Sequence, residues 1–193
     1  MGSCIAFFPF EKIIYGYPKN KFNLNYAPHF GMFKHSAGED LIDQLNFMAD
    51  EGFTAFEDNN LKKRSISDQN KIASTLTKRN LRMGVFVAHS IYWKEPNLAS
   101  GNIDKREEFL KEIRESVEVA KRVNAKWMTV VPGYKDLRLK DSYQQTNVID
   151  SLKYACDILE PYDLTMVLEP LNFRNHPGLF LKESPQAFEI CKA

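Results

Sequence analysis

Glu169 is the residue whose position in the sequence most directly suggests chemistry. It follows the apolar run 164–168, which is typical of a short β-strand buried on both faces of a parallel sheet. Pro170 cannot donate a hydrogen bond to a neighbouring strand, so the strand should end there and leave Glu169 at its C-terminal end. Active sites of α/β barrels and open α/β sheets are built at that end of the strands. A carboxylate there can act as a base or bind a hard cation.

Four more polar side chains are candidates for substrate binding. Glu57 and His89 follow two other predicted strands, and either could hydrogen-bond a substrate hydroxyl or carboxylate; His89 could also carry a proton near neutral pH. Arg174 and His176 lie in the loop after Glu169, where an arginine could bind a substrate carboxylate through two hydrogen bonds. The sequence is equally consistent with a purely structural role for Glu57 and His89. It is also equally consistent with Arg174 being a solvated loop residue.

Aromatic residues in two predicted loops could form walls of the same pocket. His29 and Phe30 lie in the first loop, and Tyr92 and Trp93 lie in the third. Plain packing is the alternative role for these side chains. The basic segment 62–64 is typical of a solvated surface, and we assign it no function from the sequence.

The elements that must position these residues alternate from residue 22 onward. Strands are predicted over 22–26, 53–56, 83–88, 127–131 and 164–168, and helices over 39–52, 67–80, 104–123, 142–160 and 184–191. Each crossover is long enough for a parallel β-α-β unit. We therefore predict an α/β fold of the TIM (β/α)₈-barrel type, with about the first five β/α units present in this chain. The first and fifth strands would keep free edges, which favours a homo-oligomer in which such edges pair or exchange.

The composition narrows the classes of partner. The chain has 193 residues, enough for one domain, and a net charge of +1, which gives no field that would recruit nucleic acid or an anionic membrane. No apolar run is long enough to span a bilayer. Cys4, Cys156 and Cys191 form no close pair and are expected to be buried apolar residues, which favours a cytoplasmic location. Residues 1–21 are interpreted as a tail or a leader remnant, and residues 22–193 as the partial barrel.

Several motifs together resemble the xylose-isomerase-like TIM-barrel superfamily, and within it the hydroxypyruvate isomerases and related sugar isomerases and epimerases. The motifs are YAPHFG at 26–31, GFTAFE at 52–57, VVPG at 130–133, LEPLN at 168–172 and NHPG at 175–178. The resemblance implies a divalent-metal enzyme that moves a proton between neighbouring carbons through an enediol. In that family a glutamate at the end of the fifth strand binds the metal and takes part in proton transfer, and Glu169 matches it.

The resemblance also implies further metal ligands on strands six to eight, beyond the five strands predicted here. Mn²⁺ or Mg²⁺ would suit ligation by carboxylates. The predicted function is therefore a metal-dependent isomerase or epimerase that acts on a small sugar or hydroxy-keto acid, with neither nucleic acid nor membrane as partner. Two alternatives stay open. One is an endonuclease IV-like DNA-repair nuclease, which four histidines and a charge of +1 fit poorly; the other is an inactive partial barrel.

Overall fold

The strands form two parallel ladders that are joined by a parallel bridge. The computed structural model describes residues 22–193, so the predicted tail lies outside the described residues. The strands are β1 (Ala55–Phe56), β2 (Arg82–Met83), β3 (Trp127–Val130) and β4 (Thr165–Leu168). β1 pairs in parallel with β2, and β3 pairs in parallel with β4. A parallel bridge between Val87 and Thr129 joins the two ladders, so the strands follow one another as in a barrel wall.

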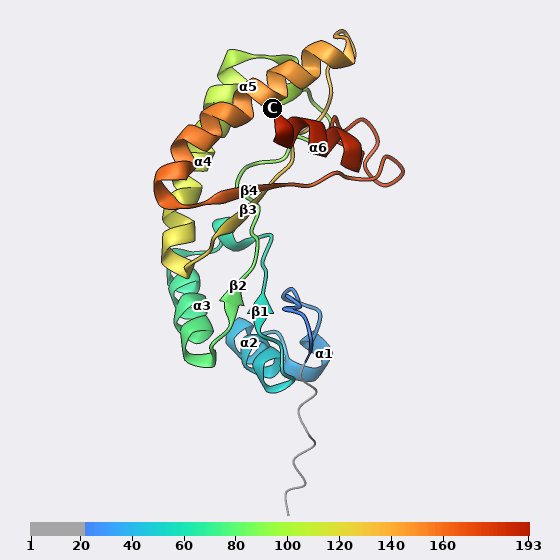
Figure 1. The fold of residues 1–193 in the computed structure, drawn as a ribbon. Helices are drawn as coiled ribbons and strands as arrows, with labels where there is room; N and C mark the ends of the chain where they lie inside the picture. The colour runs from blue at the N-terminus through green and yellow to red at the C-terminus, as the bar shows by residue number, and fades with distance from the viewer. Residues whose placement is uncertain (1–21) are drawn as a thin grey trace, which may run out of the picture.

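Most of the helices form a curved layer along one side of these strands, and the first and the last helix lie on the other side in this view (Figure 1). They are α1 (Lys34–Ala37), α2 (Leu41–Asp50), α3 (Ile66–Arg79), α4 (Ile103–Val123), α5 (Asp141–Leu159) and α6 (Ser184–Lys192), with short 3₁₀ helices η1 (Leu61–Lys63), η2 (Leu98–Ser100) and η3 (Glu160–Tyr162). α2 packs against α3, α3 against α4, and α4 against α5. No helix of residues 22–193 is both long and apolar enough to cross a bilayer.

Side chains at the helix ends explain where the long helices begin. The Ser65 hydroxyl accepts a hydrogen bond from the Asp68 N–H, and the Asn102 side chain accepts one from the Lys105 N–H. α3 therefore starts at Ile66, slightly before the predicted residue 67, and α4 starts at Ile103, one residue before the predicted residue 104. Asn80 and Asn124 end these two helices in the left-handed conformation, which asparagine tolerates better than most residues.

The core fills the space between the strands and the helical layer. Its largest fully buried side chains include Phe56, Phe86 and Met128 from the strand segments, and Leu45 and Ile113 from α2 and α4. These apolar positions recur with the spacing that sequence periodicity predicted for helices and strands. Burial of this face holds the curved wall together.

Two predicted strands differ from the structure. Residues 22–26 form no strand; the first segment reaches the sheet only at a bridge between His29 and Glu57, with the Glu57 N–H donating to the Pro28 carbonyl. Pro28 has no N–H of its own, so a regular ladder cannot continue through it. The predicted strand 83–88 is reduced to β2 and the bridge at Val87.

β4 has a free edge, because within the described residues it pairs only with β3. Its residues alternate between exposed and half-buried, and Val167 keeps 38% of its surface exposed. The prediction that 164–168 is buried on both faces is therefore wrong, although the predicted free edge of this strand is confirmed.

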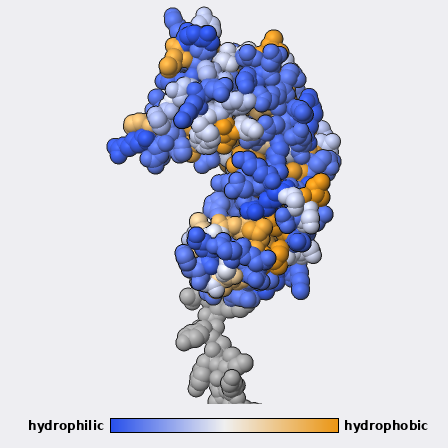
Figure 2. Space-filling model, turned by 180° about the vertical axis from the view of Figure 1, so that it is seen from behind, coloured by the Kyte–Doolittle hydropathy of each residue, from blue (hydrophilic) through white to orange (hydrophobic). Residues whose placement is uncertain are grey.

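Figure 2 shows the molecule curving around a deep indentation on one side.

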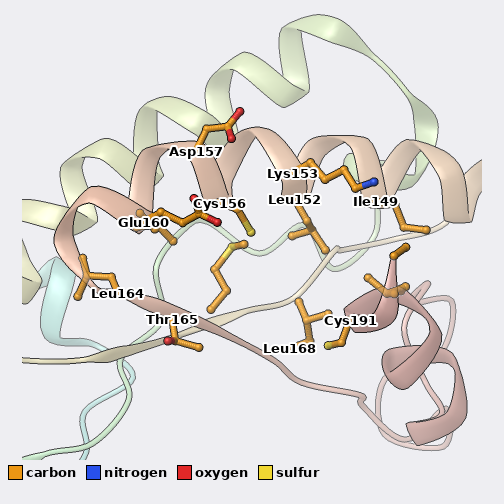
Figure 3. Close-up of a pocket in the computed structure, with 14 residues that line it drawn as sticks. Ile149, Leu152, Lys153, Cys156, Asp157, Glu160, Leu164, Thr165, Leu168 and Cys191 are labelled. Carbon is orange, nitrogen blue, oxygen red and sulfur yellow. The ribbon is translucent and has the colours of Figure 1, made fainter.

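A cavity of about 740 Å³ lies between α5, β4 and the end of α6. Leu152 and Cys156 of α5 face Leu164 and Leu168 across it, and Cys191 of α6 closes one end (Figure 3). Cys156 and Cys191 are both exposed, so the prediction that they are buried is wrong. Cys4 lies outside the described residues. The cavity wall is mostly apolar, and its charged side chains are Lys153, Asp157 and Glu160.

Candidate functional site

A second hollow, of about 600 Å³, lies at the C-terminal ends of the strands. Its lining includes three of the five predicted site residues, His89, Glu169 and His176. Lys62 and Trp93 also line it, from the loops that follow β1 and β2. The chain thus brings together side chains from three separate loops at the end of the sheet where α/β enzymes place their sites.

Glu169 lies one residue beyond β4, as the sequence predicted. Its backbone N–H donates to the Val130 carbonyl at 3.3 Å, so the main chain is held by β3. The side chain is exposed, and within residues 22–193 its carboxylate has neither a hydrogen-bond nor an ion-pair partner. Glu169 therefore presents a free carboxylate to the hollow.

His89 is buried and is engaged on both ring nitrogens. Nδ1 lies 3.0 Å from the Ser90 carbonyl, and Nε2 accepts a hydrogen bond from the Val131 N–H at 3.3 Å. Burial lowers the pKa of His89 to about 4, so the ring is neutral near pH 7. The ring thus links the ends of two strand segments, and the low pKa disfavours the predicted role as a proton carrier near neutral pH.

Lys62 is a residue whose role the sequence did not reveal. Its ammonium group donates to the carbonyls of Ala88 and Glu112, each at 3.0 Å, and lies 3.2 Å from the Glu112 carboxylate and 3.3 Å from that of Glu115. The interpretation of 62–64 as ordinary surface is therefore wrong at Lys62, which is half-buried. Its partners lie 26 to 53 residues away in sequence, so no local signal identifies it.

Glu112 connects Lys62 to the loop after His89. Its Oε2 accepts a hydrogen bond from the Ser90 N–H at 2.7 Å. Burial alone would raise the pKa of Glu112, but the Lys62 ammonium and the Ser90 N–H outweigh it, and the pKa is lowered. Lys62 and Glu112 therefore form a charged pair that fixes the floor of the hollow.

One wall of the hollow is aromatic. The rings of Trp93 and His176 lie 5.3 Å apart at an interplanar angle of 31°. This contact brings Trp93, a predicted wall residue, against His176, a predicted substrate-binding residue. The pair offers a flat, largely apolar surface beside Glu169.

Glu57 and Arg174 lie elsewhere. The Glu57 carboxylate is 2.7 Å from the His29 ring, and the Arg174 side chain is exposed; neither lines the hollow. Phe30, the other predicted wall residue of the first loop, packs against Phe56 in the core. Their predicted roles in substrate binding receive no support from this geometry.

Three loops at the same end of the sheet are joined through the segment around Tyr134. The Asn97 N–H donates to the Tyr134 carbonyl at 3.3 Å, the Lys135 N–H to the Gly178 carbonyl at 3.0 Å, and the Phe180 N–H to the Gly133 carbonyl at 2.9 Å. Gly178 has φ +86°, and a Cβ atom there would lie 2.1 Å from Cε2 of the Tyr134 ring. Only glycine fits this crossing.

We expect Gly178→Ala to lower the free energy of unfolding by about 3 kcal/mol, from backbone strain plus the clash with Tyr134. Gly31→Ala is the matched control, because Gly31 has φ +90° with no atom within 4 Å of its added Cβ. The control variant should lower the free energy of unfolding by only about 1 kcal/mol. Urea unfolding followed by circular dichroism measures both values, and equal costs for the two variants would contradict the role of the Tyr134 contact.

A metal site is not complete in this part of the chain. Among residues 22–193, no group of three or more His, Cys, Asp or Glu side chains could hold a metal ion. Glu169 could supply one ligand, and any others would have to come from outside these residues. The residues present therefore do not fit a resident metal by themselves.

Sequence and structure comparisons place the chain in a family. A family model described as "Xylose isomerase-like TIM barrel" matches residues 45–193, more than half of the chain. The chain belongs to the xylose isomerase-like TIM barrel family. This confirms the resemblance inferred from the motifs and the partial-barrel architecture. A search of curated protein sequences finds no significant match.

Solved structures support the fold of this family member. An AP endonuclease of family 2 from Brucella melitensis is similar with a TM-score of 0.70 and 23% identity, over 86% of this chain and 62% of that one. D-psicose 3-epimerase with D-tagatose from Clostridium cellulolyticum H10 has a TM-score of 0.68 and 14% identity, over 88% of this chain and 59% of that one. IolI protein with a binding zinc atom has a TM-score of 0.65 and 18% identity, over 86% of this chain and 58% of that one. The chain thus spans about 60% of the length of these structures.

Proposed function

We propose that this chain carries the base and the substrate pocket of an isomerase or epimerase that acts on a small sugar or hydroxy-keto acid. The observation that supports this most directly is that Glu169, whose carboxylate has no partner within residues 22–193, lines a hollow of about 600 Å³ at the end of β4. The family match and the epimerases among the similar structures agree with this class of reaction. Action on hydroxypyruvate belongs to the proposal and rests on the motifs of the sequence.

Glu169 has the chemistry that such a reaction needs. Its carboxylate takes the proton from a carbon that bears a hydroxyl group beside a carbonyl, and the C–H electrons form the C=C bond of an enediolate. The hydroxyl proton then moves to the former carbonyl oxygen, and return of the first proton from Glu169 to the neighbouring carbon gives the isomer. An epimer would need a second proton donor on the opposite face of the enediolate. The wall of Trp93 and His176 would hold the planar enediolate while it forms.

A divalent ion is part of this proposal. IolI, one of the similar structures, has a binding zinc atom. In this chain Glu169 would be one ligand, and Mn²⁺ or Mg²⁺ remains the expectation for a site built from oxygen ligands.

Exchange of substrate hydrogen with solvent deuterium tests the proposal. The chain is incubated with hydroxypyruvate in D₂O, with and without added Mn²⁺, and the loss of the carbon-bound proton signal is followed by NMR. Proton removal by Glu169 predicts exchange faster than in buffer containing the same additions. Exchange no faster than in buffer under both conditions would contradict the proposal and favour the inactive partial barrel.

No observation favours the nuclease alternative. The likeness to the Brucella melitensis structure, at 23% identity, concerns the fold alone. The hollow carries acidic as well as basic side chains, whereas a site for DNA needs a predominantly basic rim. A cytoplasmic location stays a prediction from the cysteine pattern.

We propose that the free edge of β4 makes the chain self-associate. A Val167→Lys variant is expected to shift the chain from dimer toward monomer, because a charged side chain on an edge strand opposes pairing. Size-exclusion chromatography with light scattering measures the mass. Ile66→Lys is the control, since Ile66 is an exposed apolar residue of α3, far in sequence from this edge. A monomeric wild type would contradict the proposal.

A further inference from the structure

The charges in the hollow are unequally compensated. Lys62 is held by two carbonyls and by the carboxylates of Glu112 and Glu115, so its charge is already met within the protein. The next residue, Lys63, also lines the hollow. Its side chain is exposed, and within the described residues its ammonium group has neither an ion pair nor a hydrogen bond.

The backbone that carries Lys63 is well fixed. Lys63 closes the short helix η1, where its N–H donates to the Asn60 carbonyl at 2.9 Å. Leu61, two residues earlier, is fully buried, and the contacts of Lys62 tie the same turn to α4 and to the end of the β2 segment. The protein therefore holds one lysine rigidly by its contacts and presents the adjacent one to the hollow.

We infer that the substrate carries an anionic group, a carboxylate or a phosphate, and that Lys63 binds this group. The inference rests on the proposed function, since it places the reacting carbons of the same molecule at Glu169. Lys63 follows β1 and Glu169 follows β4, so the two free charges come from opposite ends of the wall. Both line the same hollow, so we expect a molecule with an anionic end and a hydroxy-carbonyl end to contact both side chains.

The other basic residues near this end of the sheet do not fill this role. The side chain of Lys62 is occupied, Arg174 does not line the hollow, and Arg64 pairs with Asp58. His176 packs its ring on Trp93. Two lysines and no arginine line the hollow, and of the two only Lys63 has no ion-pair partner within residues 22–193.

Three probes with the same three-carbon skeleton test the inference. Hydroxypyruvate has a carboxylate where dihydroxyacetone has a hydroxymethyl group, and the two are otherwise identical. Dihydroxyacetone phosphate is dihydroxyacetone with a phosphate on one hydroxyl group. Affinities are measured by NMR titration of the purified chain, of Lys63→Gln, and of Lys78→Gln as the control. Lys78 is an exposed lysine of α3 that does not line the hollow.

We expect at least one anionic probe to bind wild type about fivefold more tightly than dihydroxyacetone, as a partly exposed charge pair allows. This preference should disappear in Lys63→Gln and persist in Lys78→Gln, and the anion that is preferred identifies the group. Equal affinities for all probes, no binding of any probe, or a preference that survives in Lys63→Gln would overturn the inference. Circular dichroism of both variants confirms that they are folded.

The measurement needs no turnover, so it separates this inference from the proposed function. Deuterium exchange that depends on Glu169 without a preference for anions would overturn the role of Lys63 alone. A preference for anions carried by Lys63 without exchange would leave anion binding in place and remove the reaction.

Discussion

Glu169→Gln is expected to slow deuterium exchange by about 10²- to 10⁴-fold, the usual contribution of a general base. Glutamine keeps the size and shape of the side chain but cannot take a proton at neutral pH. Because the Glu169 carboxylate has no partner within the described residues, the substitution should leave the free energy of unfolding within about 0.5 kcal/mol of wild type. The variant therefore separates the chemistry from the fold.

Glu51→Gln provides the control for this experiment. Glu51 is an exposed residue at the C-terminal end of α2 and does not line the hollow. Its exchange rate should match wild type, as measured by NMR under the same conditions. If Glu169→Gln kept the wild-type exchange rate, Glu169 could not be the base, and the proposed mechanism would have to be abandoned.

Acidification from pH 6.5 to pH 4 is expected to remove about 3 kcal/mol of folding free energy through His89 alone. Burial lowers the pKa of His89 in the folded chain from 6.5 to about 4. Between these values the unfolded chain binds a proton that the folded chain does not, so stability falls as the pH falls. At pH 6.5 half of the unfolded chains still carry the proton, so the pH dependence fades only above about pH 7.5, where His89 is neutral in both states.

His89→Asn isolates this effect, because asparagine does not titrate. Lys62 and Glu112, the charged residues that influence His89, remain in place in the variant. Denaturant unfolding at half-unit steps of pH gives the free energy of unfolding for both proteins. Wild type should lose about 3 kcal/mol more than the variant across the interval. Parallel curves would show that His89 titrates normally in the folded chain.

The helices could be predicted from the sequence with more success than the strands. Apolar periodicity over α2 to α6 is a local property of the chain, so the five predicted helices occur where expected, within a few residues. A strand requires a partner elsewhere in the chain. The segment 22–26 has suitable residues for a strand, but the contact it makes at Pro28 offers a carbonyl without an N–H.

The free face of β4 illustrates the same limit. Its apolar residues predicted burial on both faces, but burial depends on whether a neighbouring element covers them. In the described part of the chain only β3 pairs with β4, so Val167 remains exposed. Sequence pattern identifies which residues could be buried and does not identify what would cover them.

The candidate site shows a similar division. Glu169 was predicted from its place at a strand end, and this rule needs only local information. The lysine at 62 was missed because its partners lie on α4 and at the end of the β2 segment. Hydrogen bonds over such separations carry no local signature, whereas the strand-end position of Glu169 does.

The junction between the two ladders has a consequence for substrate size. At the level of the sheet, β1–β2 and β3–β4 are joined by two hydrogen bonds, from the Ala88 N–H to the Thr129 carbonyl and from the Thr129 N–H to the Phe86 carbonyl. Lys63 follows β1 of the first ladder, and Glu169 follows β4 of the second. The separation between the anion binder and the base is therefore set across this junction, together with the packing of α3 against α4. That separation limits the length of a substrate that can reach both side chains.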